Sequence, residues 1–164
     1  MTNSLKTDQG SVTVRRIEPD DFTQWLSLWS GYNAFYGRSG DTALPEAITR
    51  QTWAWFVDQA EPVHAWVAEL QGELVGFVHV VEHKSTSRIS DVCYLQDLFT
   101  APTHRGKGIA RALIGRVYQK AKEMGCSRVY WTTQASNEKA RYLYDQVATN
   151  GGFIVYSQEM HSPA

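Results

Sequence analysis

Residues 103–113, which read THRGKGIARAL, combine basic side chains and glycines at the start of a predicted helix. They follow an apolar run, 92–100, that predicts a strand. A helix N-terminus leaves backbone N–H groups unpaired and carries a partial positive charge. Glycines there let an anion approach the main chain closely. The stretch therefore predicts a binding site for a diphosphate group.

Two other glycine-rich phosphate loops do not fit this stretch. A P-loop needs Gly-Lys-Ser/Thr at a fixed distance after its first glycine, and neither Gly106 nor Gly108 meets that spacing. A dinucleotide-binding loop needs a third glycine, where this chain has Arg111, and an acidic residue about twenty positions further on, where residues 126–128 lie. For the loop alone, the remaining alternative is a glycine-capped helix with a basic surface.

Composition places the chain among globular proteins of one domain, residues 1–164. Its hydrophobic fraction of 43% argues against disorder. Sixteen basic and seventeen acidic residues leave a net charge of −1, so we expect no nucleic-acid partner. Residues 1–10 are polar and predict a flexible tail without a signal peptide, and no run is long enough to span a membrane. We therefore expect a cytoplasmic protein that does not bind membranes.

The two cysteines, Cys93 and Cys126, lie in apolar strand-like runs and share no metal-ligand spacing. Packing in the core is the expected role of both. The sequence predicts no metal site.

Hydrophobic periodicity predicts the element order β-α-α-β-β-β-α-β-α-β. A mixed, mostly antiparallel α/β sheet with helices on both faces follows from that order. The predicted strands are 12–17, 63–70, 74–81, 92–100, 127–133 and 153–160, and the predicted helices run over 19–36, 45–59, 109–124 and 138–149.

Three segments of the second half carry motifs in a fixed order. Tyr94–Thr100 reads YLQDLFT, Arg105–Arg111 contains R-x-x-G-x-A, and residues 137–144 read N-x-x-A-x-x-L-Y before a Gly-Phe pair at 152–153. These resemble the central strand, the pyrophosphate loop and the closing helix of the GCN5-related N-acetyltransferase (GNAT) family. The resemblance covers nearly the whole chain and implies the GNAT fold.

The resemblance also implies acetyl-CoA as cofactor. In the family, the central strand splays from its neighbour, and its main chain pairs with the pantetheine arm. Here the amide of Leu98 would in addition polarise the thioester carbonyl, as in an oxyanion hole. The implied cofactor-binding residues are Leu98, Phe99, Thr100, Arg105, Gly106, Lys107, Gly108, Ile109, Ala110, Arg111, Asn137 and Tyr144.

Tyr144 occupies the position of the family's catalytic tyrosine. A phenol has a pKa of about 10 and a thiol of about 8.5, so the tyrosine stays protonated and can donate to the departing sulfur. Periodicity alone would make it a core residue of an amphipathic helix. Asn137 is placed to cap that helix and to make a polar contact to the cofactor.

The general base is left open by the sequence. Gln96 stands where the polyamine-type branch carries a glutamate, and an amide cannot accept the proton. Asp97 is expected on the opposite face of the strand, as a substrate anchor or a structural carboxylate. Glu82, His79 and His83 are alternatives, and a water relay to solvent is the simplest hypothesis.

Aromatic residues of the first helix predict the acceptor pocket, because in the resembled fold the first two helices border it. Aromatic walls hold an alkyl amine and favour a cation. The expected substrate-binding residues are Tyr32, Phe35, Tyr36, Gln96 and Asp97.

The function implied is acetyl transfer from acetyl-CoA to a primary amine of a small molecule, such as a polyamine or amino acid. No cysteine is placed to carry an acetyl group, so we expect direct transfer in a ternary complex. Two alternatives stay open: acetylation of protein lysines or histone tails, and a CoA-binding sensor without turnover. Pairing of the 153–160 strand with a second copy predicts a homodimer.

Overall fold

The computed structural model describes residues 3–161. Within them the chain forms one compact unit that ends at Thr132 and a second that begins at Thr133. The strands are β1 (Asn3–Thr7), β2 (Gly10–Arg16), β3 (Val63–Leu70), β4 (Glu73–His83), β5 (Val92–Thr100) and β6 (Val129–Tyr130). The α-helices are α1 (Phe22–Phe35), α2 (Glu46–Val57), α3 (Ile109–Glu123) and α4 (Glu138–Val147), with 3₁₀ turns at Pro19–Asp21, Gly40–Thr42 and Pro102–His104.

The first unit is built on one sheet whose strands lie in the order β1-β2-β3-β4-β5-β6. Strands β1 to β5 pair antiparallel with their sequence neighbours. Strand β6 pairs parallel with β5, because α3 returns the chain between them. The mixed, mostly antiparallel α/β sheet expected from the sequence is confirmed.

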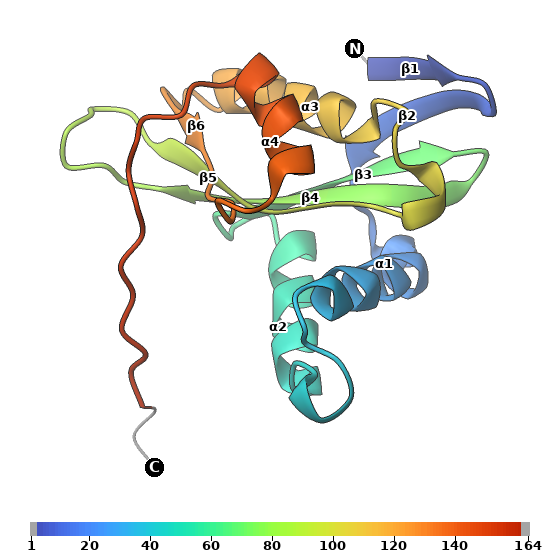
Figure 1. The fold of residues 1–164 in the computed structure, drawn as a ribbon, viewed down its shortest axis with the longest axis horizontal. Coiled ribbons are helices and arrows are strands. Elements are labelled where there is room, and N and C mark those ends of the chain that lie inside the picture. Colours follow the sequence, from blue (N-terminus) through green and yellow to red (C-terminus); the bar gives the residue numbers. More distant parts are fainter. Residues whose placement is uncertain (1–2, 162–164) are drawn as a thin grey trace. The chain divides into compact units, whose positions relative to one another are not determined.

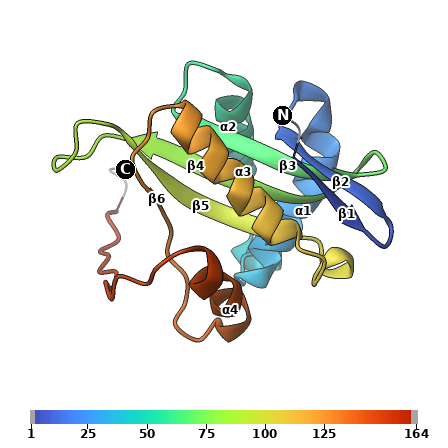
Figure 2. The same cartoon turned by 90° about the horizontal axis from the view of Figure 1, so that it is seen from above.

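Helices cover both faces of this sheet (Figure 1). Helices α1 and α2 lie against one face, and α3 crosses the other, as Figure 2 shows from above. The face under α1 is aromatic, with Trp25 and Phe77 fully buried. The face under α3 is aliphatic, with Leu113 and Val117 buried. Burial of large apolar side chains, worth about 1.5–3 kcal/mol each, holds the helices to the sheet.

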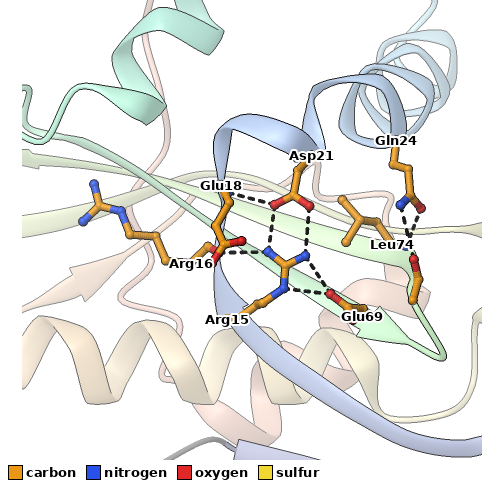
Figure 3. Close-up of polar contacts among 8 residues, drawn as sticks. Arg15, Arg16, Glu18, Asp21, Gln24, Glu69 and Leu74 are labelled. Atoms are coloured by element: carbon orange, nitrogen blue, oxygen red, sulfur yellow. Dashed lines mark hydrogen bonds and ion pairs between the residues drawn. The ribbon is translucent and has the colours of Figure 1, made fainter.

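An ion-pair cluster ties the start of α1 to the sheet (Figure 3). The Arg15 Nη atoms donate to the Asp21 carboxylate at 2.7 and 2.9 Å, and Nε donates to Glu69 Oε2 at 2.7 Å. The backbone N–H of Glu18 also donates to Asp21, at 2.8 Å. Asp21 is buried, and its hydrogen bonds from Arg15 hold its pKa below the ordinary value. The cluster thereby sets where α1 begins on the sheet.

The N-terminal prediction was wrong in part. A flexible tail was expected over residues 1–10, but residues 3–7 form β1, which pairs with β2 in the register Leu5↔Val12. The turn between them is closed by Thr7 Oγ1, which donates to Gly10 O at 2.7 Å. The polar segment becomes a strand because a neighbouring strand supplies its hydrogen-bond partners.

The prediction of a last strand over 153–160 was also wrong. Residues 148–161 contain no helix or strand, and the side chains of Phe153 and Tyr156 are 91% and 88% exposed. An apolar run forms a strand only where another strand pairs with it, and none of the described strands does. Strand β6 is likewise shorter than the predicted 127–133. The homodimer expected through residues 153–160 stays a prediction.

None of the helices within residues 3–161 combines the length and apolar character that crossing a membrane requires.

We expect Asp21→Asn to lower the free energy of unfolding at pH 7 by about 1–3 kcal/mol, since it weakens charge-assisted bonds to Arg15. The folded-state pKa of Asp21 is lowered, so its contribution is present above the unfolded pKa of about 4 and lost as pH falls through the folded value. Urea unfolding at pH 7 and below pH 4 should show the deficit shrinking in acid. Asp20→Asn, in the same turn but exposed, is the control and should change little.

Candidate functional site

The loop between β5 and α3 has the main-chain conformation of an anion site. Gly106 and Gly108 adopt φ angles of +76° and +79°, which residues with a Cβ rarely adopt. The first hydrogen bond of α3 runs from the amide of Ala112 to Gly108 O at 3.0 Å, so the amides of Ile109 and Ala110 precede it at the helix N-terminus. A Cβ built on Gly106 would meet no atom of residues 3–161 within 4 Å. The loop therefore has room beside its backbone for an anion.

Two basic side chains of this loop, Arg105 and Lys107, contact different parts of the protein. The Arg105 guanidinium lies 5.7 Å from the ring centre of Phe99 and 5.9 Å from that of Phe35, and its Nε donates to Thr100 O at 3.2 Å. Lys107 Nζ is 3.7 Å from the exposed Asp8 carboxylate in the β1–β2 turn, a weak surface pair. Arg105 thus holds the loop against α1 and β5.

Strand β5 has an open edge beside this loop. It pairs with β6 only through Cys93↔Val129 and Tyr94↔Tyr130. Over residues 95–100 no described strand pairs with that edge. The edge of β5 beyond Tyr94 is therefore left without a strand partner among the described residues, and the splay implied by the family resemblance stays a prediction.

The direction of the backbone groups on this edge follows from one hydrogen bond. Ala101 N donates to Val75 O of the β3–β4 hairpin at 2.8 Å. Because N–H and C=O groups alternate in direction along a strand, those of Leu98 and Thr100 face away from β4, toward the open edge. The Thr100 Oγ1 is also buried without a hydrogen-bond partner among residues 3–161. The edge therefore offers main-chain groups to a polar ligand.

A β-bulge lies just before these residues. Val80 pairs with Leu95 and His79 pairs with Asp97, so Gln96 is an extra residue in β5 and is exposed. A bulge of this kind redirects the side chains that follow it. Here it brings Asp97 to the α1 face of the sheet.

Asp97 ends a chain of hydrogen bonds that crosses the aromatic core. Trp25 Nε1 donates to His79 Nε2 at 3.1 Å, and His79 Nδ1 lies 2.9 Å from Asp97 Oδ2. Because an indole only donates, His79 Nε2 accepts and Nδ1 carries the proton that is donated to Asp97. Tyr32 OH donates to the other carboxylate oxygen at 2.7 Å. Residues from α1, β4 and β5 therefore converge on one carboxylate.

Burial and neighbouring charge determine the protonation states of the residues in this hydrogen-bond chain. His79 is 2% exposed, and burial lowers its pKa, so the ring is neutral at pH 7. Burial, followed by the charge of Asp97, raises the pKa of the Tyr32 phenol, so it stays a donor. Asp97 keeps 11% of its side chain exposed. It is a carboxylate at the border between the core and solvent.

The base candidates have different surroundings in the structure. His79 has both ring nitrogens in hydrogen bonds and is buried, so it is placed to orient Asp97. Glu82 lies 3.4 Å from His64 Nε2, and His83 Nε2 lies 2.7 Å from Tyr130 OH.

The aromatic group at the end of α1 is brought together with Asp97. Tyr32 is buried and its ring centre is 5.0 Å from that of Tyr36, which is half-exposed; Phe35 is 60% exposed. A cavity of about 350 Å³ opens between α1 and the end of β5, lined by Phe35, Phe99 and other residues. Tyr32 and Phe35 lie on α1, and Tyr36 caps its C-terminus. Asp97 reaches the Tyr32 hydroxyl from β5, whereas Gln96 is exposed at the bulge of that strand.

The second unit carries the remaining two site residues on or before α4. Asn137 Oδ1 accepts from Ala140 N at 3.4 Å, which confirms the expected helix cap. Tyr144 lies in the middle of α4 and is half-buried. Its role as general acid, and the contact of Asn137 to the cofactor, stay predictions.

Sequence reasoning missed the ordering of Asp97 by His79 and Trp25. One signal was available: Phe77 and His79 alternate on β4, which places His79 on the same aromatic face as Phe77. Trp25 lies on α1 and donates to His79 on β4. The Trp25–His79 hydrogen bond joins residues 54 positions apart, so no local sequence pattern could predict it.

Comparison with known proteins agrees with this geometry. The acetyltransferase (GNAT) family matches residues 22–148. The chain is 33% identical over 151 residues to the D-amino-acid N-acetyltransferase HPA3 of Saccharomyces cerevisiae, covering 90% of each protein. It is 38% identical over 138 residues to the uncharacterized N-acetyltransferase YjgM of Escherichia coli, covering 84% of this chain and 81% of that one.

Solved structures share the fold at lower identity. AAC(6')-Iy, in complex with the bisubstrate analogue CoA-S-monomethyl-acetylneamine, gives a TM-score of 0.77 at 16% identity, with coverage of 92% of this chain and 99% of that one. A ribosomal-protein-alanine N-acetyltransferase from Brucella melitensis gives 0.72 at 23% identity, with coverage of 91% and 99%.

The chain belongs to the GNAT acetyltransferase family and has the fold of that family, which confirms the resemblance found in its sequence. It is an acyltransferase of the N-acetyltransferase class.

We expect the neutral state of buried His79 to make the free energy of unfolding depend on pH. The folded pKa is lowered, so the unfolded state takes up a proton below about pH 6.5 and the free energy of unfolding falls as pH drops from 7 to 5. His79→Gln cannot titrate and should flatten that slope, while losing about 1–3 kcal/mol at pH 7 through poorer hydrogen bonding. Urea unfolding across this range measures both, and exposed His161→Gln is the control. An unchanged slope in His79→Gln would show that the ring is not held neutral.

Proposed function

We propose that the protein transfers the acetyl group of acetyl-CoA directly to a primary amine of a small molecule, such as an amino acid or polyamine, within a ternary complex. The observation that carries the proposal is the open edge of β5, which runs into the left-handed glycine loop at the N-terminus of α3. Two relatives support an amine acceptor of small size: one is named for D-amino acids and another is bound to a CoA-acetylneamine analogue.

The residues present fit the cofactor. The loop, open beside Gly106, leaves main-chain amides at the start of α3 for a diphosphate. The outward main-chain groups of Leu98 and Thr100 suit the amides of a pantetheine arm. When bound, acetyl-CoA supplies an acetyl group activated as a thioester. Lys107, Arg111 and Asn137 would add polar contacts.

Side chains and main-chain groups of the protein then have separate roles in the transfer. The Leu98 amide donates to the carbonyl oxygen of the acetyl group and stabilises negative charge that develops there. Tyr144 donates its phenolic proton to the departing sulfur. Asp97, held by His79 and Tyr32, anchors the amine as it arrives in its charged form, and the aromatic rings of Phe35 and Tyr36 border the acceptor. Gln96 cannot accept a proton, so the proton of the amine leaves through water.

Incubation of the purified protein with acetyl-CoA and a panel of amines, followed by release of free thiol, tests the proposal. Release with amino acids or polyamines is the expected result. Release only with lysine peptides would indicate the protein-modifying alternative. Binding of CoA without release for any amine would indicate a sensor.

We expect Gly108→Val to abolish binding of acetyl-CoA, because the left-handed φ of +79° strains any side chain and a Cβ there would also contact Leu5 Cδ2 at 3.4 Å, so the loop would have to shift away from its anion-binding conformation. Isothermal calorimetry with CoA measures the loss. Gly115→Val within α3, where a Cβ meets no atom within 4 Å, is the control and should bind normally. Thermal unfolding checks that both variants fold, and unchanged affinity in folded Gly108→Val would refute the site.

We expect Tyr144→Phe to lower turnover by roughly ten- to a thousandfold while acetyl-CoA affinity stays nearly unchanged, because only proton donation to the sulfur is lost. Steady-state thiol release and calorimetry separate the two effects. Tyr142→Phe, an exposed tyrosine of the same helix, is the matched control. Full turnover in Tyr144→Phe would show that another group protonates the sulfur.

A further inference from the structure

Arg38 follows the end of α1 and is fixed by a buried amide. Its Nε donates to Asn33 Oδ1 at 2.7 Å, and its backbone N–H donates to Asn33 O at 2.9 Å. Asn33 is 4% exposed and is itself held by donation of its Nδ2 to Trp29 O at 2.9 Å. The direction of this guanidinium is therefore set by the helix core.

The guanidinium lies against the aromatic residues expected to border the acceptor. Its central carbon is 5.5 Å from the ring centre of Tyr36 and 5.9 Å from that of Tyr32. Both distances are within the range of a cation–π interaction. Arg38 is half-buried, so part of the fork still reaches solvent.

Arg38 is an oriented cation without an anionic partner. Among residues 3–161, no carboxylate lies within ion-pair distance of it, and no described group accepts from its two Nη atoms. Arg15, by contrast, is paired with both Asp21 and Glu69. A fixed guanidinium fork with its terminal nitrogens available matches the geometry of a carboxylate, which it binds through paired hydrogen bonds.

Tyr32 connects this cation to Asp97. Its ring packs against Arg38, and its hydroxyl donates to the Asp97 carboxylate at 2.7 Å. A positive group therefore contacts the Tyr32 ring and a negative group contacts its hydroxyl, among the residues that we propose to border the acceptor. An amino acid, with one ammonium and one carboxylate, has complementary charges. A polyamine would bring a second positive charge toward Arg38, which is unfavourable.

We infer that Arg38 binds the carboxylate of the acceptor and makes the enzyme selective for amino acids over amines that lack a carboxylate. The inference rests on the proposed function and names its substrate class. Arg38 is a specificity-determining residue that acts on the part of the substrate remote from the reacting nitrogen.

The experiment compares D- and L-phenylalanine with 2-phenylethylamine, which lacks only the carboxylate, in the thiol-release assay. We expect kcat/KM of the wild type to favour one or both amino acids by at least tenfold. Arg38→Gln should lower kcat/KM for the amino acid by about 10- to 100-fold, as expected for a lost charge-assisted hydrogen bond, mainly through KM. The same variant should change the value for 2-phenylethylamine less than about threefold, because the amine makes no such bond.

Two further variants keep the test sharp. Arg38→Lys retains the charge without the fork and should recover part of the loss. Arg50→Gln removes an exposed arginine paired with Glu46 on α2 and should alter neither substrate. Equal loss on both substrates, or a wild type that prefers 2-phenylethylamine, would overturn the inference while the acetyltransferase function stands. Absence of thiol release with every amine would overturn the proposed function and the inference together.

Discussion

The partly buried Asp97 carboxylate is the group around which α1, β4 and β5 are arranged. A carboxylate removed from water is costly unless hydrogen bonds replace those of water, and here His79 and Tyr32 supply them. His79 donates only in one tautomer, which the Trp25 indole secures from the other side of the ring. A single charge thus requires α1, β4 and β5 to hold one relative position.

Two other features help to hold α1, β4 and β5 in this relative position. The bulge at Gln96 turns Asp97 to the α1 face, and the Arg15 cluster fixes where α1 starts on the sheet. The price of ordering so many groups is offset by the aromatic packing around them, in which Phe77 stacks on His79 with ring centres 4.3 Å apart. The end of α1, with Tyr36 and Arg38, is then presented next to the carboxylate.

Local signals in the sequence were sufficient for some elements and not for others. The glycine loop was predictable because Gly106 and Gly108 perform a backbone task that few other residues can perform. Amphipathic α3 and the β3–β4 hairpin were predictable from periodicity. Strand β1 was not, because its sequence is polar and only pairing with β2 makes it a strand. The run at 153–160 is apolar enough to predict a strand, but no described strand pairs with it, so the prediction was wrong. The hydrogen bonds of Asp97 join segments that are distant in the sequence, so they could be found only once the fold was known.

The open edge of β5 has a consequence for how such a protein can diverge. The groups that Leu98 and Thr100 turn toward this edge are peptide groups, which every residue except proline retains when its side chain is replaced. Recognition through peptide groups is therefore largely independent of sequence, whereas the other side of the site depends on particular side chains from α1 and the loop after it. In the function proposed above, acceptor preference can therefore change through substitutions in that helix while the main-chain contacts to the acyl donor stay the same.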